Sequence, residues 1–117
     1  MMAAVKLPVA FRLPDLAAAA TARWEPLRPG VDRHVLYDEG PDGPVAALLR
    51  YQPHAVIPPH EHTGWEHIYV LEGAQEDERG RYEAGTLLVN PPGTRHNVRS
   101  PGGCLVLALW EKPVRFL

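Results

Sequence analysis

The chain has 117 residues and a formal net charge of −2, and hydrophobic residues make up 45% of it. This length predicts one domain with its own core, and the slightly acidic balance argues against nucleic acid or an anionic membrane surface as a partner. Because Cys104 is the single cysteine, no disulfide forms within the chain.

Residues 1–30 are expected to form an N-terminal arm, and residues 31–117 a single folded domain. The run LAAAATA (16–22) resembles the end of a secretion signal, but prolines and charged residues interrupt the stretch before it. Asp15 is placed to cap a short helix through the alanines, which needs to dock on the domain or on a second subunit to be stable. With neither a signal nor an apolar span of about 18 residues, we expect a cytoplasmic protein.

After residue 30, pairs of proline and glycine separate short apolar runs, a pattern typical of an all-β protein. These runs have the length of strands: HVLY (34–37), VAALLRY (45–51), WEHIYVLE (65–72), TLLVN (86–90) and CLVLALW (104–110). Many short strands at close spacing favour a sandwich or a barrel. The charged stretch AQEDERGRYEAG (74–85) is expected to be an exposed hairpin or loop.

The stretch HEHTGWEH, which begins at His60, holds three of the six histidines of the chain. Side chains alternate along a strand, so His60 and His62 share a face, and Glu66 joins them if the strand bends gently between. A proline-rich turn, PPGTRHN, brings His96 to the start of a later strand. Imidazole nitrogens combined with a carboxylate oxygen suit Zn, Fe(II), Mn, Ni or Cu, rather than Ca or Mg.

Two motifs resemble those of the cupin superfamily: HEHTGWEHIYVLEG fits the first cupin motif and GTLLVNPPGTRHNVRS fits the second. From about Trp24 to the C-terminus the sequence further resembles the ChrR-type cupins. The resemblance implies a cupin double-stranded β-helix (a jelly-roll barrel) and favours zinc. It also implies three nitrogen ligands and one oxygen ligand to the metal: His60, His62, His96 and Glu66.

Two positions depart from the cupin pattern. His54 stands where a glycine usually comes six residues before the first ligand, and Ser100 stands where an asparagine usually follows the histidine of the second motif. Histidine tolerates a positive φ better than most residues, so we expect the turn at His54 to survive. Neither position is a ligand, so the prediction of a metal site is unaffected.

In the ChrR-type family, this domain forms the C-terminal half of zinc-dependent anti-sigma factors. The helical N-terminal domain that binds the sigma factor is missing from this sequence, so we expect a stand-alone cupin that does not bind a sigma factor. Exposed edges of a jelly roll can pair with a second copy, which predicts a homodimer.

Three functions are compatible with such a site. The one we favour is a metal centre that binds a small molecule, in a sensor or in an uncharacterised enzyme; zinc is preferred, with iron, manganese or nickel as alternatives. The second is a metal-dependent dioxygenase acting on a small diketone or thiol, as in similar cupins, or a hydrolase. The third is a structural or interaction domain stabilised by the metal. No general base stands apart from the ligands, which counts against hydrolysis, and no catalytic residue is assigned.

Other residues near the motifs have simpler structural interpretations. Glu61 and His67 have the opposite parity to the ligands and are expected to face away from the metal. Cys104 lies in an apolar run and is expected to pack as a small hydrophobic residue. Tyr51 and Arg50 are both candidates to enter the cavity, and parity alone does not decide between them.

Overall fold

The computed structural model describes residues 7–12, 15 and 23–117, and residues 23–117 form ten β-strands without a helix. The strands are β1 (Glu25–Arg28), β2 (Val31–Asp38), β3 (Val45–Tyr51), β4 (Ala55–Glu61), β5 (Glu66–Asp77), β6 (Gly80–Glu83), β7 (Leu87–Asn90), β8 (Arg95–Ser100), β9 (Cys104–Trp110) and β10 (Arg115–Phe116). The predicted all-β fold is confirmed. The short helix expected across the alanine run falls in residues 16–22, outside the described part of the chain.

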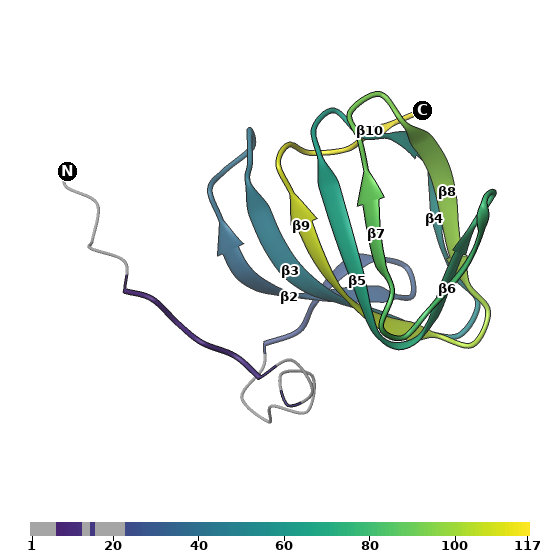
Figure 1. The fold of residues 1–117 in the computed structure, drawn as a ribbon, viewed down its shortest axis with the longest axis horizontal. Helices are drawn as coiled ribbons and strands as arrows, with labels where there is room; N and C mark the ends of the chain where they lie inside the picture. The colour runs from purple at the N-terminus through teal and green to yellow at the C-terminus, as the bar shows by residue number, and fades with distance from the viewer. Residues whose placement is uncertain (1–6, 13–14, 16–22) are drawn as a thin grey trace.

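The strands form a curled sheet whose two walls face each other (Figure 1). The order along the sheet is β1-β2-β3-β9-β5-β8-β4-β10, and β6 and β7 both pair with β5. We call the side made of β1, β2, β3, β9 and β7 wall A, and the side made of β4, β6, β8 and β10 wall B. This is the jelly-roll barrel that the two motifs imply.

Strand β5 has 12 residues and belongs to both walls. Its first half pairs with β7 and β9, and its second half pairs with β6. The register with β9 shifts between Val70 and Glu72, and Gly73 follows with a φ of 70°. A Cβ at Gly73 would collide with the carbonyl oxygen of Gly103, so the bend that carries β5 from one wall to the other requires glycine.

The stretch 74–85 forms the hairpin of β5 and β6 and most of it is exposed, as expected, but the expectation fails at its start, where Ala74, Gln75 and Asp77 are buried. Gln75 is 1% exposed and Asp77 is 3% exposed. The shift in register before Gly73 changes which side chains face inward, so an even-numbered inner face up to Val70 becomes an odd-numbered one afterwards.

The predicted single strand from His60 to Glu66 is also wrong, because two strands share this stretch. β4 ends at Glu61 and β5 begins at Glu66. The four residues between them, 62–65, carry the chain from wall B to wall A. His60 and Glu66 therefore approach one point from opposite sides of the barrel, and not along one face of a strand.

The core between the walls is apolar and includes Val31, Leu49, Val70, Val106 and Cys104. The prediction that Cys104 packs as a small hydrophobic residue is confirmed, since its side chain is buried in this cluster.

The sheet begins at Glu25, because β1 pairs with β2, although β1 lies within the range assigned to the arm. The division into residues 1–30 and 31–117 stays a prediction. Residues 7–12, 15 and 23–117 contain no helix that could span a membrane.

Candidate metal centre

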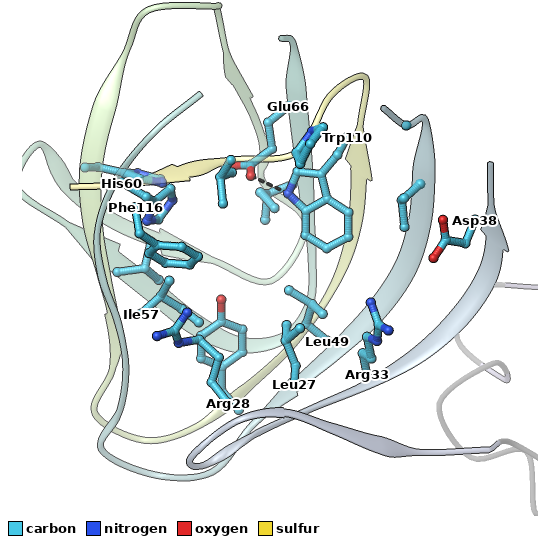
Figure 2. Close-up of a pocket in the computed structure, with 18 of the residues that line it drawn as sticks. Leu27, Arg28, Arg33, Asp38, Leu49, Ile57, His60, Glu66, Trp110 and Phe116 are labelled. Carbon is cyan, nitrogen blue, oxygen red and sulfur yellow. Dashed lines mark hydrogen bonds between the residues drawn. The ribbon is translucent and has the colours of Figure 1, made fainter. Parts of the chain in front are cut away.

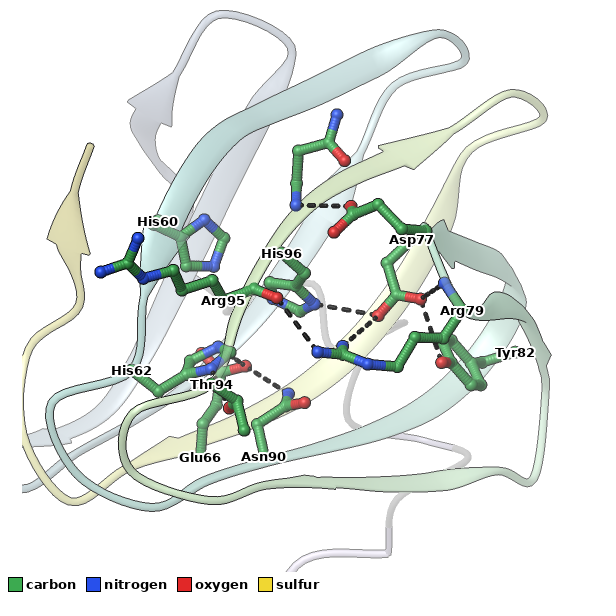
Figure 3. Close-up of polar contacts among 12 residues, drawn as sticks. His60, His62, Glu66, Asp77, Arg79, Tyr82, Asn90, Thr94, Arg95 and His96 are labelled. Atoms are coloured by element: carbon green, nitrogen blue, oxygen red, sulfur yellow. Dashed lines mark hydrogen bonds and ion pairs between the residues drawn. The ribbon is translucent and has the colours of Figure 1, made fainter.

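Three of the four predicted ligands form a compact buried cluster (Figure 3). His60 lies near the end of β4, directly opposite His96 of β8 in the register of wall B, and His62 follows β4. The three side chains are 4%, 3% and 1% exposed for His60, His96 and His62. One nitrogen of each ring lies within 4.8 Å of the corresponding nitrogens of the other two. The structure thus brings together three imidazoles that the sequence separates by up to 36 positions.

Each of the three imidazoles is held through its Nδ1 atom. Nδ1 of His60 lies 2.8 Å from the carbonyl oxygen of Pro58, and Nδ1 of His62 lies 2.9 Å from Oγ1 of Thr94. A carbonyl oxygen only accepts, and the Thr94 hydroxyl already donates its proton to the carbonyl oxygen of Pro91. Both Nδ1 atoms must therefore carry the hydrogen, which leaves the lone pair of each neutral ring on Nε2.

Asp77 holds the third imidazole. Its Oδ2 atom lies 3.0 Å from Nδ1 of His96, and its Oδ1 atom accepts from the backbone N–H of Arg79 at 2.8 Å and from the hydroxyl of Tyr82 at 3.0 Å. Burial acts to raise the pKa of Asp77, but these hydrogen bonds outweigh burial and hold the pKa below its usual value. An ionised carboxylate behind an imidazole fixes its tautomer and increases its basicity toward a metal.

The Nε2 atoms of His62 and His96 are buried and have no hydrogen-bond partner. A buried polar atom without a partner costs free energy, and most such atoms in folded proteins are paired. Here two of them converge with their lone pairs toward one region. This donor set fits a borderline divalent cation, which takes neutral imidazole nitrogens at about 2.0–2.1 Å.

Glu66 lies beside the cluster, with its carboxylate held by wall A. Its Oε2 atom accepts from Nε1 of Trp110 at 2.6 Å, and its Oε1 atom accepts from the side-chain amide of Asn90 at 3.0 Å. Oε1 also lies 3.2 Å from Nε2 of His62. Two donor atoms bound to one ion at about 2.1 Å each lie roughly 3.0–3.4 Å apart, so this spacing is compatible with a shared cation. Whether Glu66 is a ligand stays a prediction.

The electrostatics of the cluster favour the forms that bind a metal. Burial lowers the pKa of His60 below its usual value, which favours the neutral ring. Burial acts to raise the pKa of Glu66, but the nearby ring of His62, with smaller contributions from His96 and from the hydrogen bond of Trp110, holds it below its usual value. Neutral imidazoles and an ionised carboxylate are the protonation states that metal ligation requires.

A cavity of about 460 Å³ opens onto the cluster between the two walls (Figure 2). His60, Glu66 and His96 lie at its inner end, and its sides are mostly apolar. Tyr51 lines this cavity, whereas Arg50 stacks on Trp24 at 4.2 Å on another part of the surface. Burial raises the pKa of Tyr51 well above its usual value, with smaller contributions from the nearby Cys104 and Glu66, so its hydroxyl stays protonated.

The residues expected to face away from the metal do so. Glu61 pairs on the surface with Arg95 at 2.8 Å and with Arg115 at 2.9 Å. His67 lies next to Val89 and Leu109 in the register of wall A, and both of these neighbours are exposed. The turn at His54 also survives, with a φ of 69°.

Sequence reasoning missed the residues that support the imidazoles and Glu66. Thr94 and Asn90 lie within the second motif, close in sequence to His96. This proximity could have identified them as residues that support the ligands. Trp110 ends the apolar run 104–110, and nothing in that run indicates a contact with Glu66. Asp77 lay in a stretch expected to be exposed, and only the register shift before Gly73 turns it inward.

Comparison with known proteins agrees with this geometry. The family described as "ChrR Cupin-like domain" matches residues 14–114. The anti-sigma-E factor ChrR of Cereibacter sphaeroides is 33% identical over 96 residues, which cover 80% of this chain and 44% of that protein. This chain thus spans less than half the length of that relative.

Among solved structures, the anti-sigma factor ChrR in complex with SigE from Rhodobacter sphaeroides aligns with a TM-score of 0.69 and 29% identity, over 82% of this chain and 53% of that one. An acetylacetone dioxygenase from Acinetobacter johnsonii aligns with a TM-score of 0.74 over 100% of this chain and 85% of that one. Its identity is 14%, so this second likeness shows the fold alone. By its family match and its sequence identity, the chain belongs to the ChrR cupin-like family.

Proposed function

We propose that the chain binds a divalent transition metal through Nε2 of its three clustered histidines, with Glu66 as an oxygen ligand, and binds a small molecule in the cavity above it. The observation that carries the proposal is the pair of buried, unpartnered Nε2 atoms of His62 and His96. The Nδ1 atom of each of the three rings already has a hydrogen-bond partner, so a cation is the group that satisfies these two Nε2 atoms. Zinc is the metal that the family resemblance favours, and the protein acts as a sensor or an enzyme.

The cavity favours ligand binding over a purely structural metal. A structural zinc site is closed by four protein ligands, whereas a site that binds ligands keeps one position open. Here the cavity reaches His60, Glu66 and His96 directly. When bound, the metal would polarise a carbonyl or hold an oxygen donor of the small molecule. The chain itself orients the imidazoles, keeps them neutral and surrounds the ligand with apolar side chains.

The test is the metal content of the protein purified without chelators. We expect about one metal ion per chain in the wild type, and a loss of most of it in His60→Ala and in His62→Ala. The matched control is His67→Ala, which removes an outward-facing histidine from the same short stretch and is expected to keep its metal. Full occupancy in both His60→Ala and His62→Ala would refute the proposal.

A metal-dependent dioxygenase is the second candidate. It is supported by the mostly apolar cavity that reaches the histidines and by the fold shared with an acetylacetone dioxygenase. Oxygen uptake by the iron-loaded chain with acetylacetone or a small thiol would favour this candidate. Zinc in the purified protein, with no uptake after iron loading, would leave ligand binding as the function. The relative ChrR is an anti-sigma factor; the absence of sigma-factor binding and the homodimer stay predictions for this chain.

A further inference from the structure

The mouth of the cavity holds a cation without a counter-charge. We propose that the small molecule bound in this cavity carries a carboxylate, which Arg28 binds, and that an apolar segment joins it to the oxygen donors at its other end. This inference rests on the proposed metal site and names the class of ligand for it. Three observations support it. Arg28 has no ion pair with a carboxylate of the described residues, a single aromatic ring lies between Arg28 and His60, and Gln75 has an unpartnered polar atom within the cavity.

Arg28 lines the cavity at the end of β1, and its guanidinium carbon lies 4.2 Å from the centre of the Phe116 ring (Figure 2). No carboxylate in the described residues forms an ion pair with it. The neighbouring Arg33, which also lines the cavity, is paired with Glu25 at 2.8 Å. Stacking on a ring restrains the guanidinium plane and leaves its N–H edges available, which is the arrangement that binds a carboxylate with two parallel hydrogen bonds.

One aromatic ring separates Arg28 from the histidines. The Phe116 ring that Arg28 covers lies 5.7 Å from the ring of His60, because β10 pairs with β4 and places these two residues side by side. Ile57 and Leu49 also line the cavity between its mouth and its inner end. A ligand that reaches from Arg28 to the metal therefore passes mainly apolar side chains, so its middle segment is a short alkyl chain or a single ring.

Gln75 adds a polar group inside the cavity. Its side chain is 1% exposed and lines the cavity, and its Oε1 atom is buried without a hydrogen-bond partner. A buried amide in this state gains free energy when a ligand supplies a hydrogen bond. A hydroxyl or enol of the ligand that lies against this part of β5 would supply it. The ligand class is thus a short apolar carboxylic acid with a hydroxy or oxo group at the opposite end.

Two matched probes test the role of the carboxylate in the zinc-loaded chain by calorimetry. Succinylacetone is a β-diketone that ends in a carboxylate, and butyrylacetone has the same carbon chain with a methyl group in its place. We expect the wild type to bind succinylacetone about tenfold more tightly, and the preference to shrink as salt is added. Equal affinities for the two probes, or no binding of either, would overturn the inference.

The preference is expected to disappear in Arg28→Gln, while the affinity for butyrylacetone stays that of the wild type. Arg28→Lys, which keeps the charge and a stem that covers Phe116, is expected to retain part of the preference. The matched control is Arg33→Gln, which removes a cation already neutralised by Glu25 and should keep the full preference. An unchanged preference in Arg28→Gln would overturn the inference.

The metal content of every sample separates the two proposals. Zinc bound in all three variants, with no preference for the carboxylate in the wild type, would refute the role of Arg28 and leave the metal site intact. A wild type that cannot be loaded with zinc would refute both.

Discussion

Wall A and wall B face the same cavity but present different chemistry to it. Wall B and the second half of β5 supply some apolar side chains and also buried polar groups, most of which are fixed by hydrogen bonds: His60, His96, Asp77 and Gln75. Wall A supplies mainly apolar and aromatic surface, with its polar atoms at the edges: Leu27, Leu49, Tyr51, Trp110 and Arg28. Strand β5 joins the two, and Glu66 in its first half is held from wall A by the indole of Trp110.

This difference indicates that metal affinity and fold stability reside in different residues. Removing a hydrogen-bonded polar group from wall B should lower the affinity for the metal and leave the core largely intact. Removing an apolar side chain from wall A should cost folding free energy and leave the imidazoles in place. Substitutions that change both properties together would show that the walls are not separable.

Acidification is expected to have the largest effect, because it acts on all the imidazoles of the cluster at once. A protonated imidazole cannot ligate, so bound metal should fall as the pH drops below about 6. The lowered pKa of His60 means that the unfolded chain binds more protons than the folded metal-free chain in this range. Stability of the metal-free protein should therefore also fall as the pH decreases below the unfolded value of about 6.5.

Metal content and denaturant unfolding, measured from pH 7.5 to about pH 4, check both parts. A variant of wall A, Leu49→Ala, should release its metal over the same pH range as the wild type. Full metal retention at about pH 4 would contradict ligation by imidazoles.

Leu49→Ala is expected to lower the free energy of unfolding by about 2–3 kcal/mol. Leu49 is 3% exposed and belongs to the core cluster, but it also borders the cavity, which places the cost at the lower end for a buried leucine. Its metal content should equal that of the wild type. Val56→Ala is the control, because Val56 is 50% exposed on β4 and should cost less than about 0.5 kcal/mol. Loss of metal in Leu49→Ala would argue against separable walls.

Asp77→Asn is expected to weaken metal affinity by about 10–100-fold, or about 1.4–2.7 kcal/mol, because the amide no longer supports the Nδ1–H of His96 with a negative charge. The control is Glu76→Gln on the same strand. Glu76 faces outward and pairs with Arg81 and Arg99 at 3.1 Å each, so its loss should leave metal affinity unchanged. Competition with a chelator measures both variants. An equal loss in the two would mean that general charge, and not the hydrogen bond to His96, controls affinity.

The parts of the site that depend on spacing could be predicted from the sequence. The two-residue spacing of His60 and His62 holds them on one side of the barrel, and the turn before His96 aligns it with His60 across wall B. These relations follow from the alternation of side chains along a strand. The strands of the core follow from the same alternation and from the turns that separate them, so most of wall A could be predicted as well.

The rest of the site depends on strand register and strand pairing, which the alternation of side chains does not encode. The register shift before Gly73 reverses the inner face of β5, so Gln75 and Asp77 were assigned to the wrong environment. Arg28 lies in a short strand that only pairing with β2 reveals. Trp110 reaches Glu66 across 44 positions of sequence, a contact that closure of the barrel creates. Each of these three cases requires knowledge of which strands become neighbours.

His54→Gly should have the smallest effect. His54 belongs neither to the metal cluster of wall B nor to the apolar core of wall A. His54 is the one residue other than glycine with a positive φ in the described part of the chain, and its side chain is exposed. Holding an L-residue in this left-handed conformation costs about 1–2 kcal/mol, part of which glycine loses again through the entropy of the unfolded chain. We therefore expect the free energy of unfolding to rise by about 0.5–1 kcal/mol, with metal content unchanged.

Gln52→Gly in the same turn is the matched control. Gln52 is exposed and does not have a positive φ, so glycine brings only the entropic cost and should destabilise the protein by about 0.4–1 kcal/mol. Opposite signs for two glycine substitutions only two positions apart would identify backbone strain at His54 as the cause. If His54→Gly instead destabilises the protein or lowers its metal content, then the histidine contributes a contact that outweighs its strained backbone. The turn between β3 and β4 would then belong with wall B, because it would be needed to position the histidines that follow it.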